Sequence, residues 1–451
     1  MIGALKFVES RIHPRVKIYG LLLSSLILAG CAQITLFLAA DQAEFWMPEK
    51  WLDNIGNNSS PIPGLIIYIL SGIVLISGLK RIAFSNETIS FSAQPFQRGI
   101  KHFSFFVTSF GISILTCFYT AYGSIHDNNG YGLTVLWILS LCLFILSVFI
   151  TTETNSFNVK TLIDSLRNHK IELFTITLLL STAFLLRYYD LELHPYSLVN
   201  DEGEMGKGGL CILSGVCNNL FSIGWASLPF FTYLPYALSI SIFSNTGFAL
   251  RIVSAVIGSL SVLFTYLLTR ELFNKKTAII AGILLSSFSL QLHFSRLAVI
   301  NIIDSLSYPL LLWLTMKAAR TGKTGYYLLT GIFYGLAMMT YPGSRLAPFV
   351  AVLLFLLISI KTPGFIHGQR RNLSILISAS ILTFAPMGAF FLRNLDEFSS
   401  RMKMEGIIQN GSLLLEAQNS GQSQLFILFV HFLKSSLIFI TSFAPVQFFN
   451  T

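Results

Sequence analysis

The sequence predicts an all-α fold, a polytopic bundle of transmembrane helices. Of its 451 residues, 53% are hydrophobic and only 11% are charged, and its mean hydropathy is +0.67. Uncharged stretches long enough to cross the hydrocarbon core of a bilayer recur along the whole chain. Soluble domains do not have this composition. The spans must be helices, because lipid cannot satisfy exposed backbone N–H and C=O groups.

The net charge of +9 does not indicate a nucleic-acid partner. Lysine and arginine lie in short loops between apolar runs instead of forming one basic face, so they are topology signals. The first basic cluster precedes the apolar stretch 18–40, which is longer than the core of a signal peptide. We therefore expect a retained first helix in contact with membrane lipids.

The N-terminal part is predicted to contain four helices, over residues 18–40, 62–79, 102–122 and 131–151. Their connections alternate between basic and acidic or nearly neutral, so the N-terminus and the two basic connections are placed in the cytoplasm. These helices hold no cluster of ionisable residues. Residues 1–165 are therefore interpreted as an accessory module.

A fifth helix, 171–187, opens the predicted catalytic core, residues 166–451. It leads into a first extracytoplasmic loop over about 188–247. The segment 229–244 is apolar, but it is short and contains two prolines. If it crossed the membrane, every later basic loop would face outward, so we expect it to lie on the membrane surface as an interfacial helix. The remaining spans are predicted at 249–269, 277–293, 301–316, 325–341, 345–360, 372–392 and 424–443.

An acidic turn follows the fifth helix, with Asp201, Glu202 and Glu204 within four residues. Clustered charges are rare in a chain of this kind and favour a functional site. A carboxylate at the membrane boundary can act as a general base towards a hydroxyl or amine. We therefore predict Asp201 and Glu202 as catalytic residues, whereas Glu204 is interpreted as a solvated acid that can pair with Lys207.

The outward ends of later helices bring further polar residues to the same predicted face. They carry Arg296 with Asp304, and Tyr341 with Arg345. A guanidinium binds phosphate oxygens bidentately and stays charged, so the two arginines are predicted to bind a donor phosphate. The simpler interpretations are an intramembrane ion pair between Arg296 and Asp304 and an interfacial anchor at Arg345. No Cys/His metal spacing, P-loop or G-x-S-x-G elbow is present.

Cys211 and Cys217 lie in the polar segment after the acidic turn, six positions apart. A disulfide is expected if this segment faces an oxidising compartment. Two free thiols are an equally good interpretation, because spacing alone does not decide.

Four sequence segments, in this order and spacing, resemble the integral-membrane glycosyltransferases of the GT-C fold. They are most similar to the bacterial relatives of dolichyl-phosphate-mannose protein O-mannosyltransferases and aminoarabinose transferases, the family-39 type. The segments are Phe248–Ala255 followed by Gly258, then residues 270–273, 294–298 and 341–348. The resemblance covers about residues 171–400.

This resemblance implies an inverting transferase of the GT-C fold that uses a polyprenyl-phosphate-linked sugar on the outer face of the membrane. The acceptor would be a protein, a lipid or a glycan. The family's first-loop acid, the proposed base, corresponds to Asp201, with Glu202 as its support. The resemblance leaves the cofactor open: relatives differ in needing a divalent cation, and loop carboxylates are compatible with Mg²⁺ or Mn²⁺.

The remaining site residues also follow from the resemblance. The donor-side arginine of the family corresponds to Arg296, and its Tyr-x-x-x-Arg element corresponds to Tyr341 and Arg345. Many members carry an acid five residues after the first arginine. Here that position is Asn301 and the acid follows at Asp304; both are predicted to bind substrate.

Two departures from the family pattern are present. The four N-terminal helices lie outside the common core, and the chain ends at Thr451 where relatives continue, so we expect a truncated copy. The alternatives to an enzyme are a transporter or flippase for a lipid-linked or anionic substrate, and a non-catalytic relative. The expected location is a bacterial inner membrane, with the active site facing outward.

Overall fold

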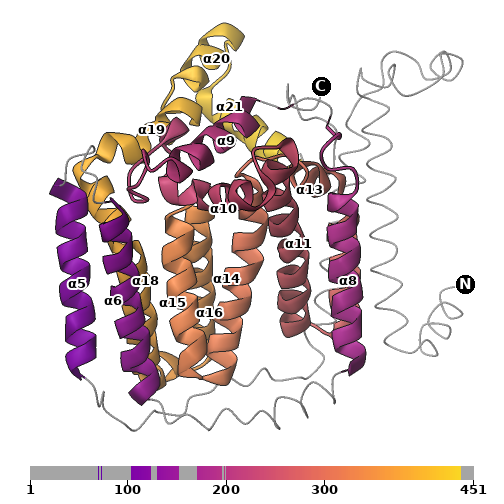
Figure 1. Cartoon of the computed structure of the whole chain (residues 1–451). Coiled ribbons are helices and arrows are strands. Elements are labelled where there is room, and N and C mark those ends of the chain that lie inside the picture. The colour runs from indigo at the N-terminus through magenta and orange to yellow at the C-terminus, as the bar shows by residue number, and fades with distance from the viewer. Residues whose placement is uncertain are drawn as a thin grey trace, which may run out of the picture. The chain divides into compact units, whose positions relative to one another are not determined.

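A computed structural model describes residues 70, 73, 103–122, 130–151, 170–195, 198 and 200–437 (Figure 1). The chain divides into two compact units, residues 90–409 and residues 1–89 together with 410–451. The described residues are helical apart from turns and one isolated β-bridge between Ile223 and Pro229. The all-α prediction is therefore confirmed. The predicted helix 18–40, and all of 62–79 except residues 70 and 73, lie outside the described residues.

Six helices among the described residues are long and apolar enough to cross a membrane, which confirms a polytopic bundle. They match the predicted spans 102–122, 131–151, 171–187, 249–269, 345–360 and 372–392. Their bounds are α5 Phe103–Tyr122, α6 Gly130–Thr151, α8 Lys170–Tyr188, α11 Gly247–Leu272, α16 Ala347–Lys361 with its preceding 3₁₀ turn η4 Ser344–Leu346, and α18 Arg370–Arg393.

Two further helices complete the bundle, α14 (Ile302–Thr321) and α15 (Thr324–Met338). α14 packs against α11, and α15 packs against α18. Figure 1 shows both running beside the longer helices. The same compact unit contains the short helix α17 (Phe365–Gly368), and α19 (Leu395–Glu405) follows α18. The other unit contains α20 (Ser412–Ser420) and α21 (Gln424–Leu437).

The predicted single span 277–293 is wrong, because the chain forms two helices there. They are α12 (Lys275–Ser287) and α13 (Ser289–Phe294), separated by Phe288 in an extended conformation with ψ 115°. The hydroxyls of Ser286 and Ser287 donate to carbonyls four residues back. Such back-bonding competes with the helix ladder and bends helices, and both serines lie directly before the break.

The segment predicted at 229–244 forms a 3₁₀ turn, η3 (Phe230–Tyr233), followed by α10 (Leu234–Phe243). A ten-residue helix rises about 15 Å, half the thickness of the hydrocarbon core. In Figure 1, α10 lies across the ends of α14 and α15 instead of running beside them. This segment is therefore too short to be a span; its placement at the membrane surface stays a prediction.

The predicted acidic turn differs from expectation, because it is the first turn of a helix, α9 (Asn200–Leu213). Carboxylates are favourable there because they face the positive end of the helix dipole. α9 packs on η3 and α10 through a cluster that includes Met205, Tyr233 and Tyr236. Glycine is needed at Gly208, because a Cβ there would lie 2.3 Å from the Tyr233 ring. This close contact fixes α9 against η3.

Helices α5 and α6 belong to the same compact unit as the predicted core. The indole Nε1 of Trp137 donates to the carbonyl of Thr383 in α18 at 3.0 Å. Phe144 of α6 packs in one cluster with Leu382 of α18. The predicted functional division at residue 165 stays a prediction, but two of the N-terminal helices are packed directly on the core.

Cys211 and Cys217 form a disulfide with a Cα–Cα distance of 5.2 Å. Of the two alternatives left open by the sequence, the structure therefore has the bonded one. The bond closes the turn that follows α9, the helix that carries Asp201. Disulfides persist in oxidising compartments.

Candidate functional site

A small pocket lies where α9, the loop before α14 and α19 meet. It is lined by four polar side chains, Asp201, Asn301, Tyr341 and Arg401. The rest of its wall is apolar and includes Met205, Trp225, Leu228, Val299 and Ile300. Three residues predicted from sequence, Asp201, Asn301 and Tyr341, are thus brought together although they lie up to 140 positions apart in the chain.

α9 turns its two acidic residues in different directions. Asp201 and Met205 both line the pocket, as expected for residues four apart on one helix face. Glu202 is fully buried on another side and forms an ion pair with Arg251 of α11, with Oε1 2.9 Å from Nε and Oε2 3.2 Å from Nη2. Asp201 is therefore available to a ligand, whereas Glu202 is used to hold the helix.

The Glu202 carboxylate also accepts a hydrogen bond of 2.8 Å from the backbone N–H of Ala298. This bond ties α9 to the loop that supplies Val299, Ile300 and Asn301 to the pocket. A single buried carboxylate thus joins three segments, α9, α11 and the loop before α14. The roles predicted for Glu202, supporting Asp201 and taking part in catalysis, stay predictions.

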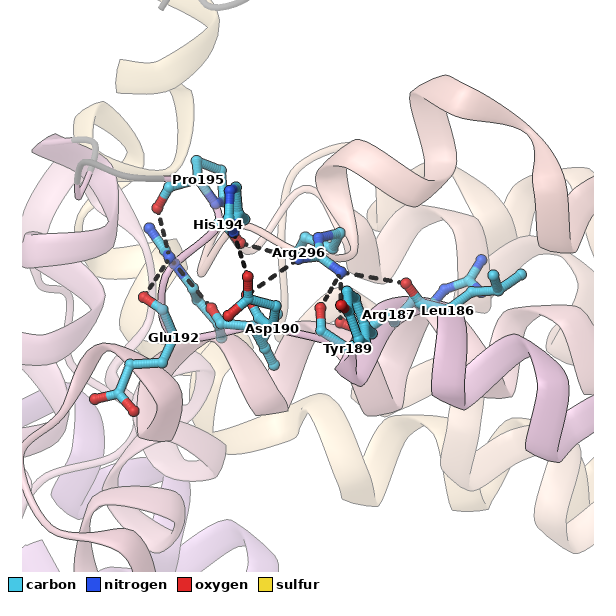
Figure 2. A network of polar contacts seen from close by, with 10 residues as sticks. Leu186, Arg187, Tyr189, Asp190, Glu192, His194, Pro195 and Arg296 are labelled. Carbon is cyan, nitrogen blue, oxygen red and sulfur yellow. Dashed lines mark hydrogen bonds and ion pairs between the residues drawn. The ribbon is translucent and has the colours of Figure 1, made fainter.

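Arg296 contacts the loop that follows α8, as Figure 2 shows. Its guanidinium donates to five backbone carbonyls. They are those of Leu186, Arg187 and Tyr189, from Nη1, and those of Asp190 and His194, from Nη2. The last carbonyls of a helix have no partner within the helix, and a cation there also complements the helix dipole. Arg296 therefore completes the C-terminal end of α8.

Arg251 contacts three further carbonyls of the same loop. Its Nη1 donates to Leu191, Glu192 and Pro195 at 3.2, 3.3 and 2.9 Å. Together the two arginines thus donate hydrogen bonds to eight backbone carbonyl oxygens between residues 186 and 195. Burial lowers the pKa of the Arg296 guanidinium while the nearby Asp190 carboxylate raises it; an arginine remains charged in either case.

These contacts show that Arg296 holds the loop; its contact with the donor phosphate stays a prediction. We expect Arg296→Lys to loosen the loop, because an ammonium with three donors cannot serve five carbonyls in a fixed plane. Amide hydrogen exchange of residues 186–195 should accelerate at least about tenfold, the loss of roughly one charge-assisted hydrogen bond. Unchanged exchange with weakened donor binding would instead identify Arg296 as a phosphate ligand.

Asp304 does not pair with Arg296. Its Oδ1 accepts a hydrogen bond of 2.6 Å from the hydroxyl of Ser344 in η4. A Cβ on Gly343 would lie 2.0 Å from Asp304 Oδ2, so only glycine permits this approach. Tyr308 adds a hydrogen bond of 3.0 Å to the Gly343 carbonyl. The start of α14 thus holds the turn that carries Arg345; substrate binding by Asp304 stays a prediction.

Arg345 is buried, with 9% of its surface exposed. Its guanidinium carbon lies 5.1 Å and 5.4 Å from the ring centres of Phe391 and Phe398, within the range of cation–π contacts. Among the residues that the structure describes, Nε and Nη2 have no hydrogen-bond partner. Buried donors are normally satisfied, so a buried cation held between two rings with free donors is suited to binding an anion.

Three residues of the site were not singled out from sequence. Arg401 lies in α19 and Trp225 lies in the turn that precedes η3, and neither carries a local sequence signal. Arg251 could have been found, because it is the one charged residue within the first five turns of the apolar helix α11, and such residues are usually functional or paired.

No three His, Cys, Asp or Glu side chains come together as metal ligands in the part of the chain that the structure describes. Asp201 is the one acidic residue of the pocket lining. A divalent cation would therefore have to take most of its ligands from substrate phosphate and water. The Mg²⁺ or Mn²⁺ prediction remains open.

The fold and the pocket agree with a family comparison. Residues 227–387 match the family model described as dolichyl-phosphate-mannose-protein mannosyltransferase. This match confirms the resemblance to GT-C glycosyltransferases of the family-39 type. The matched segment contains Arg296, Asn301, Tyr341 and Arg345, whereas Asp201 lies before it.

A curated relative is also named as a glycotransferase. Over 186 residues, 36% of this chain, the sequence is 28% identical to "Dolichyl-phosphooligosaccharide-protein glycotransferase 3" of Archaeoglobus fulgidus. The match covers 21% of that protein, so the chain matches about a fifth of the relative's length. No solved structure matches.

Proposed function

We propose that this chain is a membrane glycosyltransferase that transfers a sugar from a polyprenyl-phosphate donor to an acceptor on the outer face of the membrane. The observation that carries the proposal is the placement of Asp201 in one pocket with Asn301, Tyr341 and Arg401. The family match and the glycotransferase relative support the reaction class.

The proposed reaction is a single displacement. An acceptor hydroxyl or amine attacks the anomeric carbon while its proton passes to the Asp201 carboxylate. The bond between the anomeric carbon and the phosphate oxygen breaks, and polyprenyl phosphate leaves with the electron pair. One displacement inverts the anomeric configuration. A general base of this kind contributes typically about 10²–10⁴-fold to the rate.

Two arginines can receive the negative charge of the leaving phosphate. Arg401 lines the pocket, and Arg345 is four residues after Tyr341, which lines it too. Arg345 has buried free donors, and such preorganised donors stabilise developing charge more strongly than solvent does. We propose Arg345 as the principal phosphate ligand, with Arg401 as its neighbour at the pocket.

The proposed outward orientation rests on charge and redox chemistry. Basic loops lie at the opposite ends of the helices, at 270–276, 317–323 and 361–371, as expected of the cytoplasmic side. The disulfide after α9 favours an oxidising compartment at the site. In a bacterium this combination is found at the outer face of the inner membrane.

The proposal is tested with the purified full-length chain, a polyprenyl-phosphate sugar labelled in the sugar, and a mixture of protein, lipid and glycan acceptors. We expect labelled acceptor and free polyprenyl phosphate in equal amounts. Movement of intact donor across sealed vesicles without cleavage would instead identify a flippase. Neither cleavage nor movement with every acceptor class would contradict both.

A further inference from the structure

Trp225 begins a short 3₁₀ turn, η2 (Trp225–Ser227), and lines the same pocket as Asp201 and Tyr341. Its exposed fraction is 38%, so part of the indole can be reached by a bound molecule. An indole combines a flat apolar face with one hydrogen-bond donor. Trp225 is thus a contact surface in the pocket to which the proposed reaction assigns no role.

The backbone that presents Trp225 is strained. Ala226 and Ser227 both have positive φ, at 52° and 58°, although neither is glycine or asparagine. Residues with side chains seldom adopt this conformation, and such outliers cluster at active sites and ligand clamps. The turn is closed by hydrogen bonds from Gly224 N–H to the Leu228 carbonyl at 2.8 Å and from Leu228 N–H to the Trp225 carbonyl at 3.1 Å.

The same turn is attached to α19. The Ser227 hydroxyl contacts the Ser400 hydroxyl, and it lies 3.4 Å from Oε2 of Glu397. The residue after Ser400 is Arg401, which lines the pocket. One contact between η2 and α19 therefore sets the relative positions of an aromatic ring and a cation at the pocket.

We propose that Trp225 is a sugar-binding residue, with the ring of the transferred sugar lying on its indole. The C–H groups on one face of a sugar ring are weakly positive and pack on the negative face of an aromatic ring. Asp201, Asn301 and Tyr341 would meet the sugar hydroxyls, because a few polar groups around an apolar surface fix a ligand's orientation. The inference rests on the proposed function for the identity of the ligand, a monosaccharide linked through phosphate to a polyprenyl chain.

The competing role for Trp225 is anchoring at the membrane interface, where tryptophan is enriched. The two roles predict different effects on lipid binding. Loss of an interfacial anchor would change the affinity for every lipid ligand alike. Loss of a sugar-binding surface would weaken binding of the donor and leave binding of the sugar-free lipid unaffected. Tyr119 of α5 is the matched control, because it is an exposed aromatic residue near the predicted outer end of a span and away from the pocket lining.

The experiment measures equilibrium binding to the purified full-length chain without acceptor, so that no turnover is required. The probes are polyprenyl phosphates carrying mannose, glucose, galactose or 4-aminoarabinose, and sugar-free polyprenyl phosphate. The proteins are the wild type, Trp225→Leu, Trp225→Phe and Tyr119→Leu. We expect Trp225→Leu to raise the Kd of the best-bound sugar lipid about three- to tenfold and to leave the Kd of sugar-free lipid unchanged.

Trp225→Phe should retain most of the affinity, because phenylalanine keeps an aromatic face, and Tyr119→Leu should change neither Kd. Equal weakening of both ligands in Trp225→Leu, or no preference of the wild type for any sugar lipid, would overturn the inference. Suppose that Trp225→Leu weakens binding of the sugar lipid alone, while the wild type transfers no sugar to any acceptor. That result would retain the inference and reject the proposed transfer reaction. The two failures are therefore distinguishable.

Discussion

Asp201→Asn is expected to reduce sugar transfer by about 10²–10⁴-fold, the usual contribution of a general base. Asparagine has nearly the same shape and cannot accept the acceptor proton. The helix should keep its place, because the buried contacts of this turn are made by Glu202 and not by Asp201. Initial rates of polyprenyl phosphate release measure the effect, and the melting temperature of the purified protein verifies the fold.

The matched control is Glu204→Gln on the same helix turn. Glu204 pairs with the exposed Lys207 at 2.6 Å and does not line the pocket. Its loss should leave the transfer rate within about twofold, because Glu204 does not line the pocket and its partner Lys207 is solvent-exposed, so the ion pair contributes little. Equal loss of activity in both variants would show that the charge of the helix terminus matters and that Asp201 has no special role.

Arg251→Met is expected to destabilise the protein by about 3–5 kcal/mol, the typical result of removing one partner from a buried ion pair. Arg251 and Glu202 are 1% and 0% exposed, so the variant leaves a charged Glu202 without its cation. It also removes the donor to three loop carbonyls. Thermal denaturation in detergent or nanodiscs measures the loss as a fall of several degrees in Tm.

A double variant tests the physical cause. Arg251→Met with Glu202→Leu removes the unpaired charge as well, so it should be more stable than Arg251→Met alone. Lys403→Met is the control for a general charge effect, because Lys403 pairs with the exposed Asp396 at 2.6 Å; it should not change Tm measurably. A double variant with the same stability as Arg251→Met would instead assign the effect to the lost contacts with the loop carbonyls.

The helices could be predicted because membrane spans have a length set by the bilayer and a composition set by lipid. The parity of the basic loops predicted that 229–244 is not a span, and the helix there has only ten residues. The break at Phe288 was missed. An apolar run predicts a span, but it does not indicate whether serine hydroxyls bond the backbone carbonyls of the helix.

The roles of the site residues were harder to predict. Neighbours on a helix are rotated by about 100°, so Asp201 and Glu202 point to different surroundings although they are adjacent in sequence. The donor-phosphate role of Arg296 follows from the family resemblance and from the affinity of arginine for anions, and it stays a prediction. The partners of Arg296 here are main-chain oxygens about a hundred positions earlier, and backbone acceptors have no sequence signature.

The arginine-bound loop of residues 186–195 has a consequence for how this protein can evolve. Arg251 and Arg296 donate to eight of its main-chain oxygens, and every amino acid supplies the same oxygen. Exposed side chains of the loop, such as Tyr189, should therefore tolerate mutation far better than the two distant arginines, whereas Arg187 and Leu191 are buried and constrained by packing. Asp190 is constrained in another way, since its positive φ of 51° restricts that position to residues such as aspartate, asparagine and glycine. Divergent homologues could thus share this shape without sharing its sequence.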